Sequence, residues 1–228
     1  MPDITYNSRI LMHIFSIIQQ ILIYAIPIVF AITVHEVAHG WVASKLGDQT
    51  ARMMGRLTLN PVKHIDPVGT LVVPLILLTI TNFIFGWAKP VPVDWRNLRN
   101  PKRDMAYVAI AGPFANLLML TLWALLAKLI FISGDMYHNI APQLFEMCRA
   151  GIFINIILMV LNLFPVPPLD GSRVLSALLP PVWAYRFNRV ERYGLVILLV
   201  LLATGLLGRA LGPLVFGLDN YVTSLITV

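Results

Sequence analysis

The chain has 228 residues, of which 58% are hydrophobic and 12% charged, and its mean hydropathy is +0.78. Soluble domains carry about 25% charged residues, so this composition excludes an ordinary soluble domain. The formal charge of +6 does not indicate nucleic-acid binding, because the Lys and Arg residues lie in loops between apolar segments, as in membrane proteins. The single cysteine, Cys148, excludes an intrachain disulfide and a cysteine-rich zinc site.

Five apolar stretches are long enough to form membrane helices or parts of them, since a spanning helix needs about 20 mostly apolar residues. They cover 10–46, 68–85, 105–132, 151–164 and 194–211. We therefore expect an all-α polytopic membrane protein, a helical bundle that forms one domain over 1–228. Its parts would be a first helix at about 10–46, a re-entrant or loop region at 55–104, a helix at 105–132, another at 151–170 and a C-terminal helix at 193–215.

The strongest local motif is HEVAH at 35–39, at the end of the first apolar stretch. Residues four apart share one face of a helix, so His35 and His39 can bind one Zn²⁺ while Glu36 takes a proton from a water that the metal activates. A five-residue pattern also occurs by chance. Ionisable groups at membrane depth are costly, about 2.5 to 3.5 kcal/mol for a carboxylate, and a bound dication would compensate them. This setting favours a metal site.

A catalytic zinc needs a third protein ligand, and the chain has only 11 acidic residues to supply it. Of these, only Asp170 ends a long apolar run, in NLFPVPPLDG at 162–171. The three prolines cannot continue a regular helix, and they leave carbonyl groups unpaired at membrane depth. Such backbone is tolerated where it lines a cavity or is buried in protein. A broken helix that leads to an aspartate therefore indicates a site, and an ordinary helix end followed by a turn is the alternative.

One further histidine, His64, lies in NPVKHID at 60–66. It could be a substitute ligand, or it could hydrogen-bond to a ligand and orient it. A loop or capping role is the other interpretation, and the sequence leaves both open.

These residues resemble the site-2 protease family of intramembrane zinc metalloproteases, peptidase family M50, in its compact form without PDZ or CBS domains. The similarity extends over most of the chain: HEVAHG at 35–40, GRLTLNPVKHIDPVGT at 55–70, FGWAKPVPV at 85–93, AGPFAN at 111–116 and NLFPVPPLDG at 162–171. The resemblance implies that His35, His39 and Asp170 bind one Zn²⁺ per chain and that Glu36 is the general base. It also implies regulated intramembrane proteolysis, the hydrolysis of membrane proteins in or near a transmembrane helix, in a prokaryotic cell membrane.

Further residues gain roles from the same resemblance. Asn116 and Asn162 are similar to polar residues near the metal of this family, where an amide could hold an extended substrate or stabilise an oxyanion. Hydrogen bonding between helices is an equal alternative for both. The runs 56–60 and 87–93 could be short membrane-associated strands whose free edge pairs with unwound substrate.

The metal also constrains the membrane topology, because His39 and Asp170 must meet. Basic loops follow both residues, so both helices should run from outside to inside. An odd number of crossings must then separate them, yet two apolar segments intervene, 68–85 and 105–132. We expect that 68–85 enters and leaves on the cytoplasmic side. Four full crossings remain, with the amino terminus and the loop 133–149 outside and the site in the bilayer nearer the cytoplasm.

Three other functions are compatible with parts of this pattern. A transporter or channel could use His and Asp to coordinate an ion, but it predicts related halves or paired broken helices, which the sequence lacks. It also gives Glu36 no purpose, and neither does a scaffold that has lost catalysis. A membrane metallopeptidase that acts on soluble or prenylated peptides fits the metal, but it accounts less well for Asp170 after the prolines.

Overall fold

The structure, a computed structural model, describes residues 4–80, 86–133 and 141–227. Throughout these ranges the regular structure is helical, which confirms the predicted all-α membrane fold. The α-helices are α1 (Ile4–Lys45), α2 (Thr50–Met53), α3 (Val73–Ile80), α4 (Pro101–Ser133), α5 (Ala141–Asn162), α6 (Asp170–Leu178), α7 (Pro181–Val190), α8 (Gly194–Ala203) and α9 (Leu206–Thr227). Short 3-10 helices lie at Pro61–His64, Trp95–Asn97 and Glu191–Tyr193, and a π-helical turn lies at Pro67–Val72.

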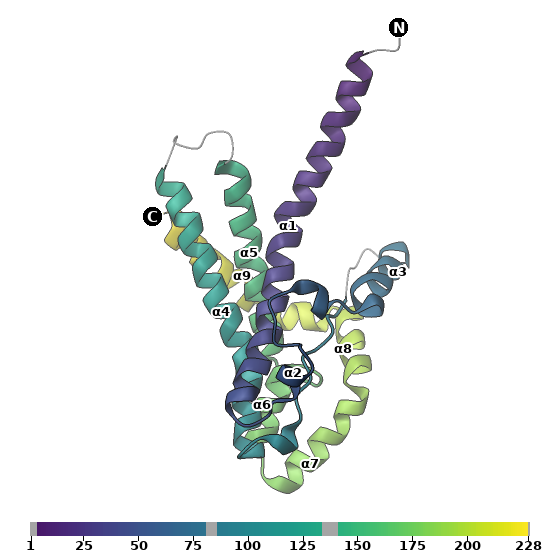
Figure 1. Ribbon diagram of the computed structural model, residues 1–228, viewed down its shortest axis with the longest axis vertical. Helices are drawn as coiled ribbons and strands as arrows, with labels where there is room; N and C mark the ends of the chain where they lie inside the picture. The colour runs from purple at the N-terminus through teal and green to yellow at the C-terminus, as the bar shows by residue number, and fades with distance from the viewer. Residues whose placement is uncertain (1–3, 81–85, 134–140, 228) are drawn as a thin grey trace.

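The core of the bundle is formed by α1, α4 and α5, which pack along one another, with α9 against α4 and α5 (Figure 1). Small residues let these helices approach closely, as is usual in membranes. A Cβ on Gly151 of α5 would lie 2.5 Å from the ring of Trp123 on α4, so only glycine fits there. The amino-terminal half of α1 extends beyond the bundle (Figure 1). The buried residues that α4, α5 and α9 share are Leu120, Ala127, Cys148, Ile152, Ile156, Val160, Val215 and Ile226.

Three helices, α1, α4 and α5, are long and apolar enough to cross a membrane, and a bent pair near the C-terminus makes a fourth span if it is counted as one. That pair, Pro181–Ala203 and Leu206–Thr227, bends by 75°. The structure differs here from the single helix expected at 193–215. Gly205 lies at the bend with a φ of 70°, a left-handed conformation that ends a helix. Of the loop 133–149, the part at 134–140 lies outside the described residues.

The helix expected at 151–170 also differs from the structure. The helix α5 ends at Asn162, and Asp170 is the first residue of α6 instead of the last residue of the preceding helix. Prolines at 165, 167 and 168 keep the intervening chain out of a regular helix, because they lack an N–H and clash with the preceding turn. The ligand candidate therefore sits at the start of a short helix.

The segment 68–85 does not form a spanning helix in its described part. After the π-helical turn, α3 has only 8 residues, and 81–85 lie outside the described residues. The Trp87 N–H donates to the carbonyl of Gly69, and the Thr70 hydroxyl donates to the carbonyl of Trp87. These hydrogen bonds join the two ends of the segment, so the chain enters and leaves it at neighbouring positions. This geometry supports the prediction that it returns to the side from which it came.

The strands expected at 56–60 and 87–93 are not formed, and no strand occurs within 4–80, 86–133 and 141–227. The second run lies beside the loop around His64, whose carbonyl accepts from the Lys89 N–H at 2.9 Å. Pro90 and Pro92 have no N–H, so alternate positions of this run cannot donate to a ladder. The run is therefore an extended loop with single backbone contacts.

A buried aspartate holds the loop after α1 to the loop before α4. Asp48 is fully buried, and its carboxylate accepts hydrogen bonds from Thr50, from the Asn97 amide and from the Asp94 N–H. Burial alone would raise the pKa of Asp48, but these hydrogen bonds hold it below its ordinary value. The segment that precedes Asp94 is thereby anchored at the end of α1.

Cysteine labelling in intact cells tests the path of 68–85. In a Cys148→Ala background, Arg99→Cys should resist a membrane-impermeant maleimide added outside, because its loop is expected to face the cytoplasm. Pro142→Cys, exposed at the start of α5, should react. Both variants should react after permeabilisation. Rapid labelling of Arg99→Cys in sealed cells would contradict the topology.

Candidate metal centre

Three side chains from distant parts of the chain meet in one cluster. The Nε2 atoms of His35 and His39 lie 3.0 Å apart, and each lies 3.2 Å from Oδ2 of Asp170. Both histidines are buried, whereas the Asp170 side chain is 21% exposed, so the cluster is not sealed. Within the part of the chain that the structure describes, this is the one group of three His, Cys, Asp or Glu residues able to hold a metal.

The two histidines are held by an antiparallel contact between α1 and α4. His39 Nδ1 lies 2.6 Å from the carbonyl oxygen of Val108, and His35 Nδ1 lies 2.6 Å from Oδ1 of Asn116. A carbonyl oxygen can only accept, so Nδ1 of His39 carries the proton. The amide oxygen of Asn116 places the proton of His35 on Nδ1 in the same way. Both Nε2 atoms are thus left with a free lone pair.

The cluster has the chemistry and the size of a zinc site. Oδ2 of Asp170 is buried and has no hydrogen-bond donor among the described residues. With both Nδ1 atoms protonated, three lone pairs converge on one another, an arrangement that is unfavourable unless a cation lies between them. Tetrahedral zinc with bonds of about 2.0 to 2.2 Å would place its ligand atoms roughly 3.3 to 3.6 Å apart. The observed spacing is close to this, so the donor set fits zinc.

A buried chain of amides supports His35 from behind. Asn116 and Asn155 are fully buried, and Nδ2 of Asn116 donates to Oδ1 of Asn155 at 2.9 Å. Asn155 in turn donates to the carbonyl of Gly151 at 2.8 Å. Partners of this kind fix the orientation of a ligating imidazole and raise its basicity. The position of His35 therefore depends on α5 as well as on α4.

Gly112 lets α4 lie directly against the two imidazoles. A Cβ at this position would lie 2.4 Å from Nε2 of His39 and 2.5 Å from Cε1 of His35. Real Cβ atoms essentially never approach other atoms within 3.0 Å. The motif AGPFAN at 111–116 thus supplies both the close approach, through Gly112, and the acceptor for His35, through Asn116 one turn later.

Asp170 reaches the histidines because the chain folds back sharply after α5. It is the first residue of α6, which packs against α4. A Cβ on Gly171 would lie 2.2 Å from the carbonyl oxygen of Leu163, so glycine is needed for the broken stretch to pass over the start of α6. The adjacent residues of the motif therefore differ in position: Asp170 is a candidate ligand, and Gly171 allows the close packing.

Glu36 is half-buried on α1 and faces the loop segment 86–94. Its Oε2 accepts a hydrogen bond from the N–H of Val91 at 2.8 Å. Gly40 allows this approach, since a Cβ there would lie 2.7 Å from Cγ1 of Val91. The glycine that follows HEVAH therefore packs the loop against the helix that carries the motif.

The three less certain sequence candidates take different positions. The full burial of Asn116 favours the interhelical alternative over contact with substrate. Asn162 donates to the carbonyl of Leu158 in its own helix at 2.9 Å, and its substrate role stays a prediction. His64 is buried with Nε2 2.9 Å from the carbonyl of Thr58, and this contact favours the loop interpretation.

Sequence reasoning missed three groups that support the site. Two are backbone groups, the carbonyl of Val108 and the N–H of Val91, which carry no signal because any residue supplies them. The third is the Asn155 side chain, which could have been identified from the sequence. An asparagine inside the apolar run 151–161 needs a hydrogen-bond partner in a membrane, and this need could have linked it to Asn116.

Comparisons with known proteins agree with this geometry. Residues 23–205 match the model of peptidase family M50. A Bacillus subtilis protein named as a zinc metalloprotease, YwhC, is 39% identical over 83% of this chain and 84% of its own length. Rip2 of Mycolicibacterium smegmatis, also named as a zinc metalloprotease, is 29% identical over 85% of this chain and 74% of its own length. No solved structure matches the chain significantly.

The substitution Gly112→Ala should disrupt the cluster. Its methyl group would displace one or both imidazoles, so we expect zinc affinity to fall at least tenfold, the lower end of what misoriented ligands lose. Zinc affinity is measured by competition with a chelator on purified protein. Gly208→Ala is the matched control, since a Cβ at that helical position meets nothing within 4 Å. Unchanged zinc affinity in Gly112→Ala would contradict the proposed ligand positions.

The substitution Asn116→Leu should remove the acceptor for His35 Nδ1 and leave Oδ1 of Asn155 without its donor. We expect zinc affinity to fall roughly 10- to 100-fold. Asn116→Asp keeps an acceptor for His35 and should recover part of the loss. Thr121→Val, on an exposed face of α4, is the control. If Asn116→Leu unfolded the protein without a selective change in zinc affinity, its role would be structural only.

Proposed function

The chain belongs to peptidase family M50, and on that basis we propose that it is an intramembrane zinc metalloprotease whose metal is held by His35, His39 and Asp170. One observation carries the ligand assignment: two Nε2 atoms and one carboxylate oxygen lie 3.0 to 3.2 Å apart, with both Nδ1 atoms engaged elsewhere. Family membership also argues against the transporter and channel alternative.

The proposed reaction is hydrolysis of a peptide bond with Glu36 as general base. Bound zinc supplies a Lewis acid that lowers the pKa of water and polarises the peptide carbonyl. Glu36 takes the proton of the attacking water and then delivers it to the leaving amine. The Val91 N–H donates to Oε2 of Glu36, and this hydrogen bond would orient the carboxylate.

We propose that the substrate is a membrane protein cut in or near a transmembrane helix, as in regulated intramembrane proteolysis. The support is the location of the cluster. His35 and His39 lie in one candidate span, α1, and they contact a second candidate span, α4. Hydrogen bonds and side chains hide the carbonyls of an intact helix, so the substrate must unwind locally. Helices with small or helix-breaking residues unwind most easily. The basic residues in the loops after α1 support a site that lies nearer the cytoplasm.

Glu36→Gln and Asp170→Asn separate the two roles. Glu36→Gln should keep stoichiometric zinc and lose cleavage of a model transmembrane substrate by about 10² to 10⁴-fold, because it cannot accept a proton. Asp170→Asn should lose zinc, because a neutral amide is a poor third ligand. The measurements are zinc content and cleavage rate on purified protein.

Glu146→Gln provides the control, since this exposed acid lies near the start of α5 and accepts a hydrogen bond from the Tyr24 hydroxyl, which a Gln oxygen can also accept. It should keep both zinc and activity. Equal cleavage by wild type and Glu36→Gln would end the proposal of proteolysis through this base. Full zinc binding by Asp170→Asn would remove Asp170 from the ligand set.

A further inference from the structure

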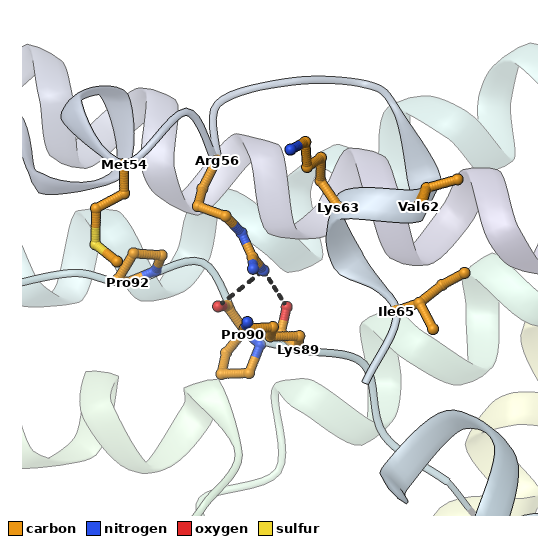
Figure 2. Close-up of a pocket in the computed structure, with 8 residues that line it drawn as sticks. All are labelled: Met54, Arg56, Val62, Lys63, Ile65, Lys89, Pro90 and Pro92. Atoms are coloured by element: carbon orange, nitrogen blue, oxygen red, sulfur yellow. Dashed lines mark hydrogen bonds between the residues drawn. The ribbon is translucent and has the colours of Figure 1, made fainter. Parts of the chain in front are cut away.

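A pocket lies outside the metal cluster, between the loop after α2 and the segment 86–94 (Figure 2). Its volume is about 450 Å³, and it is open to the outside of the protein. The metalloprotease reaction described above uses none of its side chains. The lining residues are Met54, Arg56, Val62, Lys63, Ile65, Lys89, Pro90 and Pro92.

The pocket carries three positive charges and no negative charge. Arg56, Lys63 and Lys89 line it, and no acidic residue does. Among the ion pairs of the described residues, none includes any of these three cations. Three uncompensated cations around one cavity repel one another, and an anion in the cavity would relieve that repulsion.

Arg56 is built into the pocket and is not a free surface side chain. It is only 8% exposed, and its Nη2 donates to the carbonyls of Lys89 at 3.0 Å and Pro90 at 3.4 Å, as Figure 2 shows. Its Nε is buried and has no acceptor within the described ranges. Arg56 therefore keeps donor capacity that the protein itself does not use.

The edge of the pocket is apolar and exposed. Val62 is 68% exposed and Met54 63%, and both line the same cavity as the cations. Apolar side chains beside Lys and Arg are typical of surfaces that lie in the interface of a membrane. A small soluble anion would leave these side chains in water, whereas a lipid would cover them.

We propose that this pocket binds the phosphate group of an anionic phospholipid, with Arg56, Lys63 and Lys89 around the phosphate and the apolar edge against the lipid chains. Arginine and lysine are the residues that bind phosphate in proteins. The expected topology places the pocket on the cytoplasmic side, where the membrane surface is negative. Free phosphate and acidic peptides are also anionic, so these two ligands are the alternatives that the experiment must exclude.

Native mass spectrometry of the purified full-length chain in a neutral detergent tests the proposal. Phosphatidylglycerol should bind at one high-affinity site, and phosphatidylcholine should bind far more weakly. The double variant Lys63→Gln with Lys89→Gln should bind phosphatidylglycerol roughly 25-fold more weakly, since each cation near an anionic lipid surface contributes about a factor of five. Arg56 is left intact because its carbonyl contacts support the loop.

The matched control is Arg52→Gln with Arg99→Gln, which removes the same charge from exposed side chains outside the pocket. It should bind phosphatidylglycerol like wild type. Equal weakening in the control would show a general charge effect and overturn the site. Displacement of the lipid by inorganic phosphate at the same concentration, or by a hexaglutamate peptide, would overturn the lipid as ligand. Equal binding of the two lipids would do the same.

Discussion

The arrangement of this bundle depends on one contact, in which the imidazole edges of His35 and His39 lie against bare backbone at Gly112. The contact sets the distance between α1 and α4, because any side chain at Gly112 would push the helices apart. It also sets their register, because His39 meets Val108 and His35 meets Asn116 at the two ends of the same face. The Nε2 atoms are then left pointing at the start of α6, where Asp170 completes the cluster.

Hydrogen bonds between polar side chains fix the register of the helices, which apolar packing alone does not determine. A helix in lipid gains little from burying leucine or isoleucine against another helix, since lipid chains are equally apolar. Hydrogen bonds between helices in membranes are worth about 0.6 to 2 kcal/mol each, and they need a single register. The links from His35 through Asn116 to Asn155 tie three helices at one level. Sliding α4 by one turn would leave His35 Nδ1 without its acceptor and Oδ1 of Asn155 without its donor in an apolar interior.

The ligand candidates could be predicted from the sequence because chemistry restricts them to few residue types. A zinc ligand must be His, Cys, Asp or Glu, and Asp170 was found by elimination among 11 acids and from its position after the prolines. The joined ends of 68–85 agree with the parity of crossings that the metal requires.

What could not be predicted depends on backbone geometry. The bend at Gly205 depends on a positive φ, which the sequence does not specify. The strand expected at 87–93 does not form, because this segment makes only single hydrogen bonds to carbonyl and amide groups of its neighbours. The contact of Gly112 with the two imidazoles becomes visible only when the rings opposite it are placed. These features depend on contacts between two segments, so the sequence of either segment alone does not predict them.

The proposed general base, Glu36, and the proposed metal ligands are held by different parts of the chain. Val91 holds Glu36, while the carbonyls of the two preceding residues, Lys89 and Pro90, hold Arg56. Prolines on both sides of Val91 lack an N–H, so within 90–92 only Val91 can donate to the carboxylate, and their fixed φ angles make the stretch stiff. A shift at Arg56 would therefore move the amide that orients the base. The proposed ligands are positioned by α1, α4, α5 and α6 through none of these contacts, so we expect that the base can be displaced while the metal stays bound.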